Sequence, residues 1–287
     1  MKIGVILKTL SSEYWRYVSA GIQDAEEVYG CEILLQGPPS ETSYDQQMQM
    51  IETALDTGDL DALVISPLQP DMVANAIADA KIPVIALDTK IPSDKALTFV
   101  GTGNEDAGYQ GASYIADMLE EGDEVAIISG VQGDPTAEAR MAGFKKAIEE
   151  KGLNLVATQF ADAVAEKAVD AMQSILQTNP DVKAVFCNND EMAVAANRAA
   201  RQAGNDQVLT LGFDGIKSGV EAIIEGNLTA SIAQAPYEMG LISVEKAIVA
   251  AKGETLDEFY DTGTTNIDSN NASDYLVGLE ELLSKVK

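Results

Sequence analysis

Two aspartates stand directly after short apolar runs, where a role in ligand binding is plausible on physical grounds. Asp88 follows Pro83–Leu87, and Asp214 follows Val208–Phe213. Apolar runs of this length between helical patterns are typical of strands in a buried parallel sheet. Open α/β folds bind their ligands at the carboxyl ends of such strands. A single aspartate at such a place is equally typical of a solvated turn, so the other strand ends are decisive.

Polar or aromatic residues follow other predicted strands as well. Aspartate, asparagine and arginine make fixed, often bidentate hydrogen bonds, and a flat aromatic ring can cover an apolar face. Together they suit a polyhydroxylated ring, with carboxylates and amides taking the hydroxyls. Each residue alone has another interpretation: a turn former, a helix cap, a hydrophobic staple for Trp15, or a lysine at residue 8 that reaches solvent or pairs with Asp88 or Asp214. The set at or near strand ends is Lys8, Ser12, Tyr14, Trp15, Asp88, Arg140, Asn189, Asp214 and Gln234.

Composition excludes several kinds of chemistry. The chain has no histidine, which removes the commonest general base and the commonest metal ligand. Cys31 and Cys187 lie far apart in apolar runs, so they form no metal motif and are expected to be buried free thiols rather than a disulfide. These absences exclude a Ser-His-Asp or Cys-His mechanism and a histidine-ligated zinc site, and we expect no enzyme, no metal site and no cofactor.

The charge of the chain restricts its partners. Lys and Arg number 19 against 46 Asp and Glu, a net charge of −27, which repels nucleic acids and anionic membranes. No segment reaches the roughly 18 apolar residues of a membrane span. The N-terminus runs straight into a strand at residues 3–7, so we expect either a cytoplasmic protein or an exported one whose signal is absent from this sequence.

The order of the predicted elements indicates two α/β domains. Two successive series of five strands alternate with helices, which predicts parallel sheets, and the first boundary falls near residues 102–104. The tail after Gln234 offers a helix at 239–252, an extended piece near 259–267 and a last helix near 272–286. We expect this tail to return to the first domain and then cross again. Asn104 is expected to cap the helix after the fifth strand.

The chain resembles the periplasmic sugar-binding proteins of the ribose type, which share their fold with lactose-repressor-type regulators. Four stretches carry the resemblance: 82–88 (IPVIALD), 184–193 (AVFCNNDEMA), 212–215 (GFDG) and 232–236 (IAQAP). It implies two doubly wound parallel-sheet lobes joined by a hinge of three crossings, with ligand in the interdomain cleft. The first lobe would be 1–102 plus 235–263, and the second 103–234 plus 264–287.

The resemblance also implies a function. The protein would capture a monosaccharide or polyol by hinge closure and deliver it to the permease of an ABC transporter, acting as an extracytoplasmic monomer. The implied ligand contacts are Ser12, Tyr14, Trp15, Asp88, Arg140, Asn189, Asp214 and Gln234, and Lys8 is added from its position.

Departures from the ribose pattern put ribose itself in doubt. Thr89 stands where an arginine is expected, Ala163 where an aromatic is expected, and Ser12 where an asparagine is expected. Lys8 is also unusual for a plain ribose site. The result would be a roomier pocket with a different charge.

Two alternatives remain open at this point. One is the sugar-responsive core of a lactose-repressor-type regulator without its DNA-binding headpiece. The other is a nucleotide enzyme, suggested by the glycines of residues 101–108, although their spacing and position differ from a dinucleotide loop.

Overall fold

The computed structural model describes residues 1–284 of the chain, and they divide into two compact units. The first unit comprises Met1–Thr102, Ala235–Gly263 and, among the described residues, 283–284, and the second comprises Gly103–Gln234 and Thr264–Leu282. Residues 285–287, which the sequence assigned to the second lobe, lie outside the described residues. Each unit contains its own sheet and its own hydrophobic core.

The sheet of the first unit has six strands in the order β11-β5-β4-β3-β1-β2, all of them paired in parallel. Strands β1, β3 and β4 lie in its middle and are apolar on both faces, as expected for a parallel sheet covered by helices. The strands are β1 (Lys2–Ile6), β2 (Glu32–Gln36), β3 (Ala62–Ile65), β4 (Val84–Leu87), β5 (Ala96–Gly101) and β11 (Phe259–Asp261).

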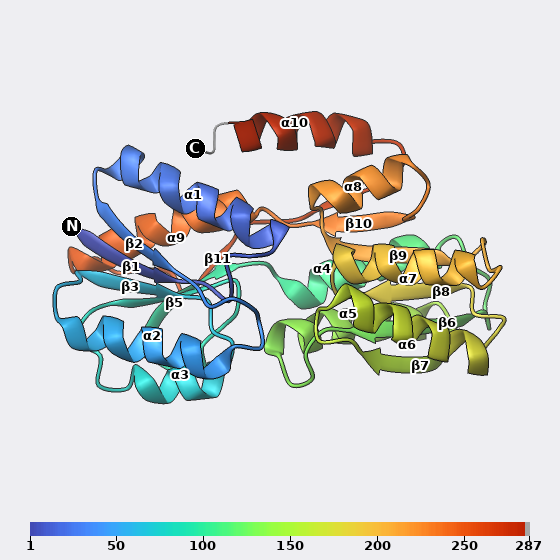
Figure 1. Cartoon of the computed structure of the whole chain (residues 1–287), viewed down its shortest axis with the longest axis horizontal. Helices are drawn as coiled ribbons and strands as arrows, with labels where there is room; N and C mark the ends of the chain where they lie inside the picture. Colours follow the sequence, from blue (N-terminus) through green and yellow to red (C-terminus); the bar gives the residue numbers. More distant parts are fainter. Residues whose placement is uncertain (285–287) are drawn as a thin grey trace. The chain divides into compact units, whose positions relative to one another are not determined.

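Helices cover both faces of this first sheet (Figure 1). Helices α2 (Tyr44–Thr57) and α3 (Pro70–Ala76) pack on one face, where Ile51, Val73 and Ile77 join a buried cluster with β3 and β4. Helices α1 (Glu13–Tyr29) and α9 (Pro236–Ala251) lie on the other face and pack closely against each other.

The second unit repeats this plan with the strand order β12-β10-β9-β8-β6-β7. The edge strand β12 pairs antiparallel with β10, while the other strands pair in parallel, so the predicted parallel-sheet fold is confirmed with one antiparallel edge. The elements are β6 (Glu124–Ser129), β7 (Asn154–Phe160), β8 (Ala184–Cys187), β9 (Leu209–Asp214), β10 (Ala230–Ala233) and β12 (Thr265–Ile267), with α4 (Asn104–Ala116), α5 (Pro135–Glu150), α6 (Ala165–Thr178), α7 (Asp190–Gln202), α8 (Lys217–Ile224) and α10 (Ala272–Ser284).

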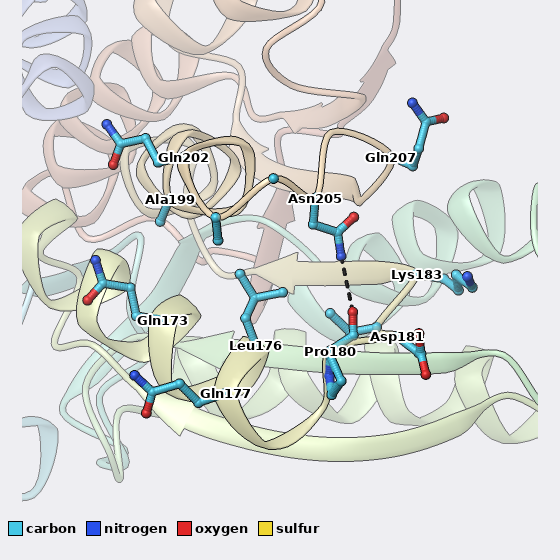
Figure 2. Close-up of a pocket in the computed structure, with 13 residues that line it drawn as sticks. Gln173, Leu176, Gln177, Pro180, Asp181, Lys183, Ala199, Gln202, Asn205 and Gln207 are labelled. Carbon is cyan, nitrogen blue, oxygen red and sulfur yellow. Dashed lines mark hydrogen bonds between the residues drawn. The ribbon is translucent and has the colours of Figure 1, made fainter.

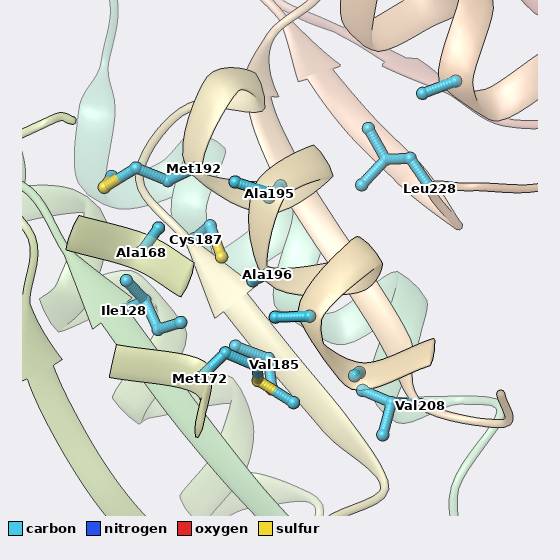
Figure 3. Packing of buried hydrophobic residues seen from close by; sticks show 14 of the residues in the cluster. Ile128, Ala168, Met172, Val185, Cys187, Met192, Ala195, Ala196, Val208 and Leu228 are labelled. Atoms are coloured by element: carbon cyan, nitrogen blue, oxygen red, sulfur yellow. The ribbon is translucent and has the colours of Figure 1, made fainter. Parts of the chain in front are cut away.

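Two hydrophobic clusters fill the second unit, one on each face of its sheet. Figure 3 shows part of the larger cluster, where Met192 and Ala196 of α7 meet Cys187 and Val185 of β8 and Met172 of α6. The other cluster joins α4 and α5 to the opposite face and includes the fully buried rings of Phe144, Phe186 and Phe213. The ends of β8 and β9 are therefore fixed from both sides.

Two details of the predicted elements are corrected, one in the tail and one at Asn104. The extended piece near residues 259–267 is two strands, β11 and β12, which complete one sheet each, so both sheets have six strands rather than five. Asn104 is the first residue of α4, and Gly103 occupies the cap position, so the predicted cap was wrong by one residue. No helix among residues 1–284 is long and apolar enough to span a membrane.

Candidate ligand-binding site

In the first unit, a buried cluster surrounds Asp88 at the carboxyl end of β4. The Tyr14 hydroxyl donates a hydrogen bond to Asp88 Oδ1 at 2.8 Å, and the Thr89 hydroxyl donates to Oδ2 at 3.0 Å. The Lys8 ammonium, just beyond β1, lies 3.8 Å from Oδ2. Lys8 therefore pairs with Asp88, one of the two carboxylates that the sequence offered as its partner.

The aromatic pair of this cluster lies in the first turn of α1. Tyr14 and Trp15 are both buried, with their rings edge to face at 5.2 Å between centroids. The Trp15 indole N–H donates to Glu41 Oε1 at 2.8 Å, which fixes the ring against the loop after β2. Ser12 is the cap residue of α1, but its hydroxyl makes no capping hydrogen bond.

In the second unit, a corresponding cluster surrounds Asp214 at the carboxyl end of β9. The Gln234 amide donates to Asp214 Oδ1 at 2.7 Å, and Arg140 Nη1 lies 3.5 Å from the same oxygen. Arg140 and Gln234 are both buried. The structure thus brings together Arg140, Asp214 and Gln234, three residues that lie far apart in the sequence.

Several groups hold the Arg140 guanidinium in place. Its Nε donates to Asn104 Oδ1 at 2.9 Å, and its Nη1 donates to the Asn188 carbonyl at 2.7 Å. The guanidinium carbon lies 3.7 Å from the centroid of the Phe213 ring, a cation–π contact. The side chain therefore has one orientation, with Asp214 at its end.

Asn189 is the cap residue of α7 and therefore has a structural role. Its Oδ1 accepts the backbone N–H of Met192 at 2.9 Å, which caps the helix. Because this oxygen is used, the amide Nδ2 is the group that Asn189 can offer to a ligand. The helix-cap interpretation and the ligand-contact prediction are thus compatible.

The departures from the ribose pattern have a structural setting. Thr89 is fully buried and bonds to Asp88, so it occupies part of the space around that carboxylate. Ala163 is half-buried at a φ of 58°, next to Asp162, whose φ is 49° and whose carboxylate pairs with Lys167. Because residue 163 is alanine, it supplies no aromatic ring at this position.

The two clusters share an electrostatic design. Each contains one carboxylate in contact with one cation, Asp88 with Lys8 and Asp214 with Arg140. Each of these two aspartates is thus paired with a cation, although the chain as a whole carries −27. Among residues 1–284, no group of three or more His, Cys, Asp or Glu side chains could hold a metal ion. The clusters can make hydrogen bonds to an uncharged polar molecule.

A groove of about 720 Å³ in the second unit lies away from these residues (Figure 2). Its walls include Pro180–Lys183 and Ala203–Asn205, which precede β8 and β9, so it lies at the amino ends of the strands. Asp214 lies at the carboxyl end of β9. The groove therefore contains none of the predicted ligand contacts.

Sequence reasoning missed the residues that support the predicted contacts. Glu41 holds Trp15, while Asn104, the Asn188 carbonyl and Phe213 hold Arg140. Asn188 and Phe213 stand beside predicted residues at strand ends, which is the only signal that could have drawn attention to them. Glu41 lies in an irregular loop, where no periodic pattern singles it out.

Comparison with known proteins identifies the family. The family model described as a periplasmic binding protein domain matches residues 3–255. The chain is 33% identical over 265 residues to the ribose import binding protein RbsB of Salmonella typhimurium, covering 90% of this chain and 87% of the relative. It is 36% identical over 264 residues to the D-allose-binding periplasmic protein of Escherichia coli, covering 86% of this chain and 84% of the relative.

Solved structures agree with these matches. A solute-binding protein from Actinobacillus succinogenes with bound D-allose has a TM-score of 0.88 at 27% identity, covering 96% of this chain and 99% of that chain. One from Agrobacterium radiobacter in complex with D-arabinose has a TM-score of 0.89 at 28% identity, covering 100% and 98%. The chain therefore belongs to the periplasmic binding protein family, in the branch of the ribose-type sugar-binding proteins.

Proposed function

We propose that this protein captures an uncharged monosaccharide or polyol outside the cytoplasm and delivers it to an ABC importer. The observation that carries the proposal is the pair of clusters around Asp88 and Asp214, each at the carboxyl end of a strand. Hydrogen-bond donors and acceptors are held there in fixed orientations, as recognition of hydroxyl groups requires. The relatives are sugar-binding proteins, which favours transport over the regulator alternative.

The charge of the clusters supports an uncharged ligand. A sugar acid would bring a negative charge to carboxylates whose cations are already paired, and an amino sugar would bring a second cation beside Lys8 or Arg140. An unpaired charge in such a buried setting costs several kcal/mol. A neutral sugar avoids this cost, since its hydroxyls both donate and accept.

Capture proceeds by closure of the two lobes on the sugar, each supplying part of the contacts. Lys8, Ser12, Tyr14, Trp15 and Asp88 would contribute from the first lobe. Arg140, Asn189, Asp214 and Gln234 would contribute from the second. The closed form acts as a monomer and is the form that the transporter permease receives. Selectivity follows because a ligand without one hydroxyl leaves a buried polar partner unpaired.

A thermal-shift screen tests this proposal. The panel contains D-ribose, D-allose, D-arabinose, D-fucose and myo-inositol, with D-gluconate and D-glucosamine as charged controls. At a concentration of about 100 times Kd, a bound sugar stabilises the folded form by about 2.7 kcal/mol, which raises Tm by roughly 5–10 °C. We expect at least one neutral compound to reach this shift and neither charged control to do so. The absence of any neutral shift, or a larger shift with D-gluconate, would overturn the proposal.

Asp214→Asn tests the site with the best sugar from that screen. The substitution keeps the volume of the side chain and removes its charge, so we expect affinity to fall at least about 10-fold while circular dichroism stays unchanged. Asp206→Asn is the matched control, because Asp206 is exposed at the other end of β9. Equal affinities for the two variants would reject the site assignment.

A further inference from the structure

Asp190 is a buried carboxylate that is not among the predicted ligand contacts. It is the first residue of α7, and its side chain is fully buried in the second unit. Its Oδ2 accepts the backbone N–H of Ile216 at 3.0 Å. Ile216 is the cap residue of α8 and lies two residues after Asp214. Asp190 therefore connects α7 to the turn that carries the Asp214 side chain.

Two glycines make room for this carboxylate. A Cβ atom at Gly212 of β9 would lie 2.1 Å from Asp190 Oδ1, and one at Gly219 of α8 would lie 2.5 Å from Oδ2. No side chain fits at such distances. The carboxylate thus lies between β9 and the first turn of α8, against both of the elements that flank Asp214.

The turn that it holds is in an uncommon conformation. Asp214 has a φ of 111°, in a region that non-glycine residues rarely adopt, and Gly215 has a φ of 66°. Such a residue costs of order 1–3 kcal/mol and persists only where its surroundings fix it. The Gly215 N–H donates to Ser231 Oγ at 3.2 Å on one side, and the Ile216 N–H donates to Asp190 on the other.

We propose that Asp190 is a positioning residue for sugar binding, acting through the Ile216 amide to set the orientation of Asp214. This rests on the proposed function, since Asp214 is there a ligand contact. The carboxylate is also placed favourably, because it accepts the N–H of the cap residue at the amino end of α8. Because Asp190 is fully buried, we assign it no direct contact with the sugar.

The test uses three variants of the full chain. Asp190→Ala removes the acceptor, Asp190→Asn restores an acceptor of nearly the same volume, and Asn197→Ala is the matched control. Asn197 is also buried on α7, but it donates to Thr210 Oγ1, away from the turn. Amide hydrogen exchange at Gly215 and Ile216 is measured without sugar, and affinities for D-ribose and D-allose are measured by calorimetry.

We expect Asp190→Ala to speed exchange at Ile216 at least 10-fold and to weaken sugar binding about 10-fold. Asp190→Asn should recover most of both losses, and Asn197→Ala should lower stability without either effect. In the Asp214→Asn background, Asp190→Ala should weaken binding no further, because the two residues act as one unit.

The outcomes separate this proposal from the proposed function. Unchanged exchange at Ile216 in Asp190→Ala, or unchanged sugar affinity with faster exchange, would overturn the positioning role. The positioning role would also be overturned if the losses of binding free energy caused by Asp190→Ala and Asp214→Asn added fully in the double variant. If neither sugar bound the wild-type protein and the wider panel failed too, the proposed function would fail, and the exchange measurement would still decide whether Asp190 holds the turn.

Discussion

At the scale of single residues, Asp88 and Asp214 have the same backbone feature, a positive φ, and each of them also pairs with a cation. Asp88 has a φ of 63° and Asp214 a φ of 111°, and each directly ends or follows a strand. Strained residues of this kind cluster at sites of ligand binding. The hydrogen bonds and ion pairs around each aspartate therefore stabilise a backbone conformation that is otherwise unfavourable.

The buried Lys8–Asp88 pair should contribute more to stability than a shorter pair at the surface. Lys8→Met leaves the Asp88 charge buried with only part of its partners, so we expect the free energy of unfolding to fall by about 2 kcal/mol. Lys2→Met is the control: Lys2 lies 2.7 Å from Asp59, but both side chains are solvated, so its loss should be small. Urea denaturation measures both. Equal losses for the two variants would contradict this prediction.

The sequence could predict which polar residues lie at strand ends because they obey a rule of the fold. Asp88, Asp214 and Gln234 follow apolar runs, and the carboxyl ends of parallel strands meet at one edge. It could not predict how Arg140 is oriented, since Asn104 and the Asn188 carbonyl reach it only through the packing of other elements. The role of Asp190 could not be predicted either, because its neighbours are a backbone amide and two glycines that sequence periodicity does not reveal.

At the scale of elements, each unit contains a pair of helices whose backbones approach each other closely at glycines. A Cβ at Gly143 of α5 would lie 2.1 Å from the Glu105 carbonyl oxygen of α4, and one at Gly21 of α1 would lie 1.9 Å from the Tyr237 carbonyl oxygen of α9. The close approach of α5 to α4 also brings Arg140 to Asn104. Helix spacing thus determines the position of Arg140, a proposed ligand contact.

Gly143→Ala should separate α4 from α5. We expect the free energy of unfolding to fall by about 1–3 kcal/mol, and sugar affinity to fall with it because Arg140 moves. Gly278→Ala in α10 is the matched control, because a Cβ there meets nothing within 4 Å. That variant should be more stable than the wild type by roughly 0.5–1 kcal/mol. A Gly143→Ala protein as stable as wild type would show that the helices can move apart freely.

Element boundaries were harder to predict than element types. The strands and helices of both βα series lie where the apolar periodicity places them, because burial of one face or both determines the pattern. The tail was the exception: β11 and β12 have three residues each, with mixed burial, and are too short for periodicity to separate them. Only pairing with β5 and β10 defines them.

At the scale of the whole molecule, each unit has a tyrosine that ties distant segments together through an aspartate. Burial and a hydrogen bond to Asp268 raise the pKa of Tyr114 to about 12 in the second unit. In the first unit, a hydrogen bond to Asp24 and burial raise the pKa of Tyr237 to about 12. The same bond from Tyr114 lowers the pKa of Asp268.

These shifts predict a loss of stability at alkaline pH in both units. An unfolded tyrosine has a pKa near 10. The contribution of each bond is therefore complete below about pH 10 and is lost as pH rises toward 12. Tyr114→Phe should flatten this dependence, and it should also reduce the loss below about pH 4, where Asp268 gains a proton in the unfolded chain. Unfolding by urea from pH 3 to 11 measures the curves, and parallel curves for variant and wild type would refute the assignment.

The two cysteines give the molecule a practical property. Cys31 and Cys187 are free and buried, one in each unit, and burial raises the pKa of both thiols. A thiol-directed dye should therefore ignore them in the native protein and react with a cysteine introduced on the surface of the second unit. Trp15, the single tryptophan, lies in the first unit and can act as the energy donor. If the two units close on the sugar as proposed, one such substitution turns the chain into an optical sensor for its solute.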